Sequence, residues 1–265
     1  MHPVLWELSL GRFGQFTLGT YGLFYAAAFL VAVRVSMAYG RREGIDPARI
    51  IDLGIWVLLS GIVGAKLLLI LIDLPYYWRH KAEILTNWRS AGVFYGGFLM
   101  AVAVGAVYVR RHHLPLGKVA DAAAPGLALA QALGRVGCLA AGCCYGRTTA
   151  SRWALTFVDP RAHDLTGVPL GVPLYPTQIY HGVADLAVFG LLVYLYRSKR
   201  ADGLIFWVYV FSYAVLRFFI EFYRGDFRGE VFGGLLSTSQ LIAIVAAALS
   251  LFFLIRLRAR ASPGA

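Results

Sequence analysis

The chain has 265 residues, of which 59% are hydrophobic and only 15% are charged. A soluble globular domain is about half apolar and about a quarter charged, so this composition excludes a single water-soluble core. The formal net charge is +11, but the basic residues lie in short loops between apolar runs. That placement argues against a nucleic-acid partner and favours a membrane.

Seven apolar runs along the chain are each long enough to cross a hydrocarbon layer about 30 Å thick. They predict an all-α membrane protein with seven transmembrane helices, in a single integral membrane domain that covers residues 1–265. The runs span residues 19–38, 51–73, 91–110, 118–139, 181–197, 203–222 and 237–256.

The basic residues are concentrated in alternate loops, which is the pattern of the cytoplasmic side of a membrane. This pattern predicts an amino terminus outside and a carboxyl terminus inside. The inside residues are Arg41, Arg42, Arg49, Arg110, Arg111, Lys118, Arg197, Lys199, Arg200, Arg256, Arg258 and Arg260.

Two longer segments are predicted to lie outside. Residues 74–90 mix aromatic and basic side chains, which suits a half-amphipathic helix at the level of the lipid headgroups. Residues 140–180 are rich in proline and glycine, which prevents a long helix and predicts a loop or a small cap.

Charged residues inside apolar runs are costly in lipid and usually face a cavity or a partner. Arg217 and Glu221 are spaced i, i+4, so they share one helix face and can pair. A structural ion pair between helices is one interpretation of this spacing. A functional site is the other, and it is favoured for ionisable groups inside a membrane.

Four guanidiniums at one predicted depth would form a clamp for a phospholipid headgroup, because each can grip a phosphate with two parallel hydrogen bonds. They belong to Arg135, Arg147, Arg217 and Arg224. For Arg147 and Arg224, snorkelling of a long side chain at a helix end is the alternative.

The stretch GRVGCLAAGCCYGR, residues 134–147, contains all three cysteines of the chain. Its glycine spacing predicts a helix that ends in a turn, where free backbone N–H groups would face an anion. Packing or a disulfide is the expected role of Cys138. Cys143 and Cys144 are left open between packing and a nucleophile whose pKa is lowered by a nearby arginine.

Several motifs, in order along the chain, resemble those of bacterial prolipoprotein diacylglyceryl transferases. They are TYGLFY (20–25), FYGGFLM (94–100), DAAAPGLALAQALGRVG (121–137), YPTQIYH (175–181), LRFFIEFYRGD (216–226) and STSQLIAI (237–244). The resemblance implies an enzyme of the bacterial inner membrane with a periplasmic cap. Such enzymes transfer the diacylglyceryl group of phosphatidylglycerol to the lipobox cysteine of a prolipoprotein signal peptide, form a thioether and release glycerol phosphate. No cofactor and no metal are expected.

The resemblance assigns Arg135 and Arg217 to the family's essential arginines, and Glu221 to the partner of the second. Together with Tyr95, His181 and Cys143, the two arginines form the expected catalytic set. The expected substrate-binding residues are Tyr21, Gly96, Gly97, Gly134, Arg147, Gln178, Glu221 and Arg224.

The chain departs from the family pattern at positions of acid–base chemistry. Tyr95 stands where the family usually has histidine, and an ordinary tyrosine is a poor base at neutral pH. Cys138 and Cys143 replace the usual asparagine and glutamate, while Tyr175 and His181 replace histidine and glutamate. These changes predict a divergent branch, leave a different acceptor open, and make His181 the expected substitute base.

Three other functions compete with diacylglyceryl transfer. Cys143 or Cys144 could act as a nucleophile in a thiol-dependent lipid or acyl transferase. A non-catalytic phospholipid-binding or transport protein on the same fold is a second alternative, because fold does not fix function. A membrane thiol oxidoreductase is the weakest, since no quinone or haem motif accompanies the cysteines.

Overall fold

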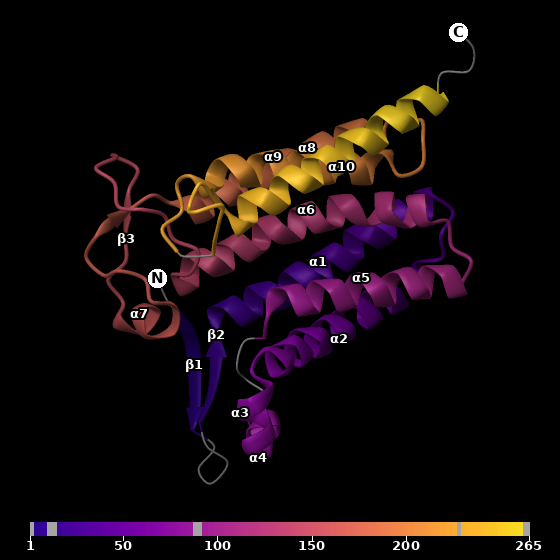
Figure 1. Cartoon of the computed structure of the whole chain (residues 1–265). Helices are drawn as coiled ribbons and strands as arrows, with labels where there is room; N and C mark the ends of the chain where they lie inside the picture. The colour runs from indigo at the N-terminus through magenta and orange to yellow at the C-terminus, as the bar shows by residue number, and fades with distance from the viewer. Residues whose placement is uncertain (1–2, 10–14, 87–91, 227–228, 262–265) are drawn as a thin grey trace. The chain divides into compact units, whose positions relative to one another are not determined.

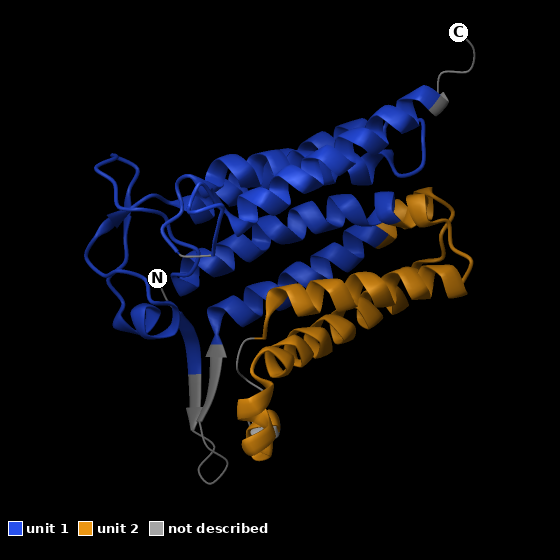
Figure 2. Ribbon diagram, in the orientation of Figure 1, with its two compact units in different colours: residues 1–36, 120–265 blue, residues 37–119 orange. Residues whose placement is uncertain are grey.

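The structure, a computed structural model, describes residues 3–9, 15–86, 92–226 and 229–261. It is mainly helical, and the long helices form where the apolar runs predict them (Figure 1). The chain divides into two compact units, unit 1 with Met1–Ser36 and Ala120–Ala265, and unit 2 with Met37–Val119 (Figure 2).

Six helices within the described residues are long and apolar enough to cross a membrane. They are α1 (Thr20–Arg42), α2 (Pro47–Ile72), α6 (Leu116–Ala141), α8 (Thr177–Tyr196), α9 (Leu204–Glu221) and α10 (Thr238–Ala261). The third predicted run, residues 91–110, forms α5 (Phe94–Arg111), a helix of 18 residues that ends in two arginines and is not among these six. The prediction of a multi-pass membrane protein is confirmed, with six spans supported by length and composition.

In unit 2, α2 and α5 pack closely through glycines. A Cβ atom added at Gly64 would lie 2.5 Å from the carbonyl oxygen of Gly96, and one at Gly97 would lie 2.7 Å from that of Gly61. Small residues of this kind let helix backbones approach in a membrane. Gly96 and Gly97 therefore have a packing role here, and their predicted role in substrate binding stays a prediction.

The predicted interfacial helix of residues 74–90 forms two short helices, α3 (Leu74–Arg79) and α4 (Lys81–Thr86), which His80 separates. The Tyr76 hydroxyl donates a hydrogen bond of 2.8 Å to a carboxylate oxygen of Glu83 and so links the two helices. Residues 87–90 of the predicted helix lie outside the described residues.

Unit 1 is built around packed helices. Helix α8 packs on α9, and α9 packs on α10 (Figure 1). Helix α6 contacts α1, and a Cβ atom added at Gly137 would lie 2.9 Å from Cβ of Phe24. The described short strands of this unit form antiparallel pairs, namely β1 (Val4–Ser9) with β2 (Gln15–Gly19), β3 (Leu155–Thr156) with β4 (Pro173–Leu174), and β5 (Glu230–Val231) with β6 (Leu236–Ser237).

A small folded segment, here called the cap, follows α6 within residues 140–180; its predicted place outside the membrane stays a prediction. It contains the β3–β4 pair and α7 (Pro160–Thr166), and its apolar core is made by Phe157, Ala162, Val168 and Leu174. Gly142, in the turn after α6, is so close to this core that an added Cβ atom would lie 3.1 Å from that of Ala162. The cap is therefore packed directly onto the end of α6.

Asp121 anchors α6 to the start of α9. It is fully buried, and its carboxylate accepts hydrogen bonds from the backbone N–H groups of Gly203 (2.7 Å) and Phe206 (2.9 Å). The ammonium of Lys199 lies 2.9 Å away. A carboxylate at a helix N-terminus satisfies free N–H groups and complements the helix dipole, so Asp121 acts as a cap supplied by another helix.

Candidate active site

The predicted pair of Arg217 and Glu221 on α9 is confirmed, with 2.5 Å between Nη1 and Oε2. Helix α10 and the residue before it extend this pair. Arg217 Nη2 donates to the hydroxyl of Ser239 at 3.0 Å, and the Ser237 hydroxyl donates to Glu221 Oε1 at 3.0 Å. Arg217 is therefore held in place by groups on two adjacent segments, which the sequence alone did not connect.

Arg224 lies just beyond α9 and is buried. Its Nε and Nη2 atoms donate to the two carboxylate oxygens of Asp226, at 2.9 and 2.6 Å, and Nε is 3.7 Å from Glu221 Oε2. Burial alone would lower its pKa, but the hydrogen bonds to Asp226 raise the pKa of the Arg224 guanidinium above its ordinary value. The bidentate geometry is the strong form of this interaction, so most of the guanidinium edge of Arg224 is occupied.

Arg147 is exposed, and both its side chain and its backbone bond to main-chain carbonyl groups of the segment after α9. Its side-chain Nε donates to the carbonyl oxygen of Arg224 at 3.1 Å, and its backbone N–H donates to that of Tyr223 at 2.9 Å. The preceding Gly146 touches the Tyr175 carbonyl so closely that no larger residue fits without displacement. Arg147 therefore ties the end of the GRVGCLAAGCCYGR stretch to the segment after α9.

Arg135, on α6, differs from the other arginines of this site. Its Nε is 4.0 Å from Oδ2 of Asp185 on α8, and among the described residues its side chain makes no hydrogen bond. Asp185 is buried and was missed by the sequence reasoning, although a carboxylate within an apolar run was a usable signal. Most of the Arg135 guanidinium therefore stays available to a ligand.

His181, on α8, is only 1% exposed. Its Nε2 is 3.4 Å from Nη1 of Arg217. A guanidinium has only donors, so Nε2 must accept, and the imidazole in this contact is the neutral tautomer that carries its proton on Nδ1. Arg135, Arg217 and Arg224 all act electrostatically on this ring, so the structure brings the predicted histidine and three of the four predicted arginines together.

The three cysteines also come together at the end of α6, and their sulfur atoms lie within 4.8 Å of one another. Cys138 is buried, while Cys143 and Cys144 are partly exposed, and no disulfide joins these three described residues. Hydrogen bonds from the other two thiols, together with the Arg224 guanidinium, hold the pKa of the Cys144 thiol below its ordinary value. The corresponding hydrogen bonds raise the pKa of Cys143.

Two buried side chains of α8 hold the backbone that carries these thiols. Gln178 Nε2 donates to the carbonyl oxygen of Cys143 at 2.9 Å, and the Thr177 hydroxyl donates to that of Cys144 at 2.8 Å. Gln178, predicted to bind substrate, thus has a structural contact in this structure. Thr177 was not singled out by the sequence, because only the fold places it beside the cysteine turn.

The model of one protein family, described as prolipoprotein diacylglyceryl transferase, matches residues 9–256. The chain belongs to this family. A phosphatidylglycerol–prolipoprotein diacylglyceryl transferase 2 from Clostridium perfringens is 35% identical, with 90% of each chain covered. Transferases of the same description from Clostridium tetani and Thermosynechococcus vestitus are 34% and 31% identical, with 92% or more of every chain covered.

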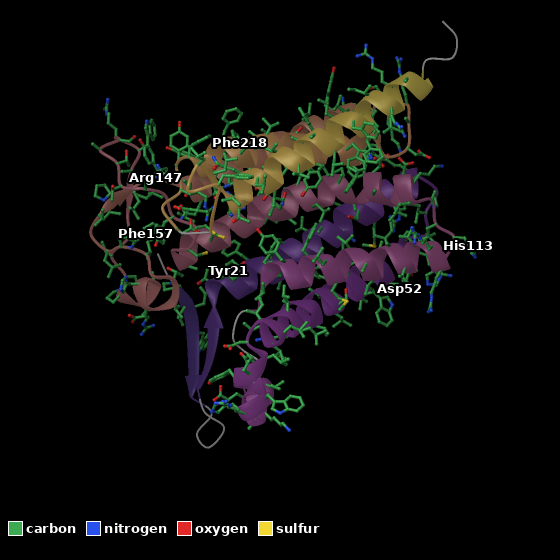
Figure 3. All side chains as sticks on the ribbon, viewed as in Figure 1. Tyr21, Asp52, His113, Arg147, Phe157 and Phe218 are labelled. Carbon is green, nitrogen blue, oxygen red and sulfur yellow. The ribbon has the colours of Figure 1, made fainter. Side chains whose placement is uncertain are left out.

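The remaining predicted site residues of this family member lie in different places. Tyr21, at the start of α1, is partly exposed and stacks on Tyr25, and Figure 3 shows it toward the same end of unit 1 as Arg147. Gly134 faces open space, since an added Cβ atom would meet no other atom within 4 Å. Tyr95 belongs to unit 2, so its relation to the site in unit 1 stays a prediction.

Proposed function

We propose that the chain transfers the diacylglyceryl group of phosphatidylglycerol to the cysteine thiol of a prolipoprotein. Membership of the family and the names of the relatives support this reaction. The observation that carries it in the structure is Arg135. This partly buried arginine lies 4.0 Å from its carboxylate partner and makes no hydrogen bond among the described residues, so it can receive a phosphate.

In the proposed reaction, negative charge develops on the phosphate that Arg135 and Arg217 are proposed to bind. The acceptor sulfur, having lost its proton, forms a C–S bond to the glyceryl carbon that carries the phosphate. The C–O bond breaks, and its electron pair leaves with glycerol phosphate, whose phosphate gains a negative charge. Donors that are fixed in a water-poor site before the reaction stabilise such charge without reorganisation, and this is the role proposed for Arg135 and Arg217.

His181 is proposed to position Arg217. Its single imidazole lone pair accepts from that arginine at 3.4 Å, so in this arrangement His181 is not available to remove the proton of an acceptor thiol. Glu221 and Ser239 hold the same guanidinium from two other directions. The geometry thus favours His181 as a support of the phosphate site, and the thiol must lose its proton elsewhere.

The membrane arrangement is proposed from the sequence. Helix α5 forms the seventh span of a single membrane domain in the bacterial inner membrane, with the amino terminus outside and the carboxyl terminus inside. The cap of residues 140–180 then lies on the periplasmic side, where a signal peptide with its lipobox cysteine is presented. Tyr21, Arg147 and Arg224 are proposed to contact the headgroup or the peptide.

The test is release of glycerol phosphate from phosphatidylglycerol by the purified protein, with a lipobox peptide and with the same peptide carrying serine for cysteine. Release is expected only with the cysteine peptide, and Arg135→Ala and Arg217→Ala should lose it. Arg152→Ala, an exposed arginine of the cap, is the matched control. Lipid binding without release would instead favour a binding protein, and a lipid adduct on Cys143 or Cys144 would favour the thiol nucleophile.

A further inference from the structure

The turn after α6 is built to bring three thiols to one point. The N–H groups of Gly142 and Cys143 both donate to the carbonyl oxygen of Cys138, at 3.0 and 3.1 Å, which closes the helix and reverses the chain. Gly142 and Cys144 both have positive φ, 82° and 60°. That conformation is uncommon for a residue other than glycine and is held only where surroundings impose it. Here Thr177 and Gln178 supply those surroundings.

The spacing of the sulfur atoms matches the needs of a metal ion. Zinc–sulfur bonds of about 2.3 Å in a tetrahedral site place sulfur atoms about 3.8 Å apart. The three sulfurs already lie within 4.8 Å of one another, so small side-chain rotations reach that spacing. Thiolates are the ligands that select soft ions, and three protein ligands with one open position are the arrangement of catalytic zinc sites.

The charges around the cluster favour a divalent ion. Three thiolates around Zn²⁺ carry a net charge of −1, and the acceptor thiolate brings it to −2, whereas the same four ligands around Cu⁺ would carry −3, which is costlier to bury. Arg135 acts electrostatically on Cys138 and Cys144, and Arg224 acts on Cys144. These guanidiniums do not bind the ion themselves, and their positive charge compensates the negative charge of the complex.

We propose that Cys138, Cys143 and Cys144 bind a zinc ion whose fourth position takes the thiol of the acceptor peptide. The inference rests on the proposed function and deepens it, because it names the group that generates the acceptor thiolate. The two partly exposed ligands, Cys143 and Cys144, leave a side from which a peptide thiol can approach. In this proposal the three cysteines, through the zinc ion, take over the deprotonation of the acceptor thiol from an acid–base residue, and packing is not their only role.

The proposed step balances without redox chemistry. A thiol that coordinates a zinc ion is deprotonated, and its proton passes to the external water. The bound sulfur uses a lone pair to form the C–S bond, while the C–O bond of phosphatidylglycerol breaks toward glycerol phosphate. The thioether product is neutral and a weaker ligand than the thiolate, so it leaves, and the zinc ion returns to its three cysteine ligands unchanged.

The metal site is tested first by binding. Purified full-length protein, reduced and stripped with chelator, is titrated with Zn²⁺ and with Co²⁺, which reports thiolate ligands by a charge-transfer band. One ion per chain is expected, and Cys138→Ser, Cys143→Ser and Cys144→Ser should each weaken binding by about tenfold or more. Because Cys138 is buried, Cys138→Ala is made alongside, with thermal unfolding as the check on folding. Reduced, folded protein that binds neither ion would overturn the site.

The fourth position is tested by adding the lipobox peptide to the Co²⁺ protein. The cysteine peptide should change the cobalt d–d spectrum, and the serine peptide should not. No change with either peptide, or tight Cu⁺ binding that ignores the peptide, would overturn the role in thiol activation. Arg217→Ala separates the two proposals, because it should keep metal and peptide binding while it loses transfer. If the wild-type protein shows both bindings but never releases glycerol phosphate, the proposed function fails and the metal site stands.

Discussion

Helix α6 carries a buried charge, Asp121, near one end and a partly buried charge, Arg135, near the other, and the two have very different numbers of partners. At one end Asp121 accepts two backbone hydrogen bonds of 2.7 and 2.9 Å and lies 2.9 Å from Lys199. At the other end Arg135 is 4.0 Å from Asp185 and makes no hydrogen bond among the described residues. Removing either charged group from water costs free energy. Only for Asp121 do hydrogen bonds and a close ion pair within the protein offset that cost.

This difference separates a structural group from one that is prepared for a ligand. A buried charge with all of its partners holds helices together, as Asp121 holds α6 to α9. A buried charge without close partners persists only where something else compensates it, and in a membrane protein that marks a functional site. Removing Asp121 should therefore reduce stability, and removing Arg135 should reduce activity.

The largest effect is expected for Asp121→Ala. The change leaves the N–H groups of Gly203 and Phe206 unsatisfied and takes a close carboxylate from Lys199, so the free energy of unfolding should fall by about 3–5 kcal/mol. Thermal unfolding in detergent measures it, with Asp164→Ala as the exposed control. An Asp121→Ala protein as stable as the wild type would contradict the conclusion that Asp121 holds α6 to α9.

Arg135→Ala should show the opposite pattern. Loss of one fixed donor to a developing anion costs about 10²–10³ in rate, and stability should change little because the side chain makes no hydrogen bond among the described residues. The rate of glycerol phosphate release is compared with that of Arg152→Ala, which should equal the wild type. A large fall in melting temperature with normal activity would show that Arg135 is structural after all.

The sequence predicted the parts of this site that depend on local spacing. Arg217 and Glu221 pair because i, i+4 spacing places them on one helix face, and the same reasoning found the long helices from their apolar runs. It did not find Asp185, Thr177 or Ser239, because each reaches the site from another helix.

Two other differences have physical causes of the same kind. Helix α5 was predicted as a span from its apolar run, but it is not among the six helices that length and composition support as spans, and it ends in two arginines. The cysteines were recognised as a group, but their convergence depends on positive φ at Gly142 and Cys144. Such a turn is fixed by the cap and by α8, which no local pattern encodes.

Gly146→Ala tests whether close backbone approach matters at the cap. An added Cβ atom would lie 2.6 Å from Cβ of Tyr175 and 2.8 Å from the Tyr223 carbonyl oxygen, so segments must move apart at a cost of about 1–3 kcal/mol. Gly134→Ala is the matched control, because it meets no atom and should be neutral or raise stability by up to about 1 kcal/mol. Equal melting temperatures for the two variants would contradict the packing.

The smallest effect is expected for Ser239→Ala, which tests how firmly Arg217 must be held. The change removes the 3.0 Å hydrogen bond from Arg217 Nη2 but leaves Glu221 and His181 in contact with the same guanidinium. A hydrogen bond to a charged group contributes about 1.5–3 kcal/mol at most, and two remaining partners should limit the loss of rate to about tenfold or less. Ser250→Ala is the control on the same helix, because that buried hydroxyl donates to the carbonyls of Ala246 and Ala247 in its own helix. If Ser239→Ala were as slow as Arg135→Ala, Arg217 rather than Arg135 would be the main group that stabilises the negative charge of the leaving phosphate.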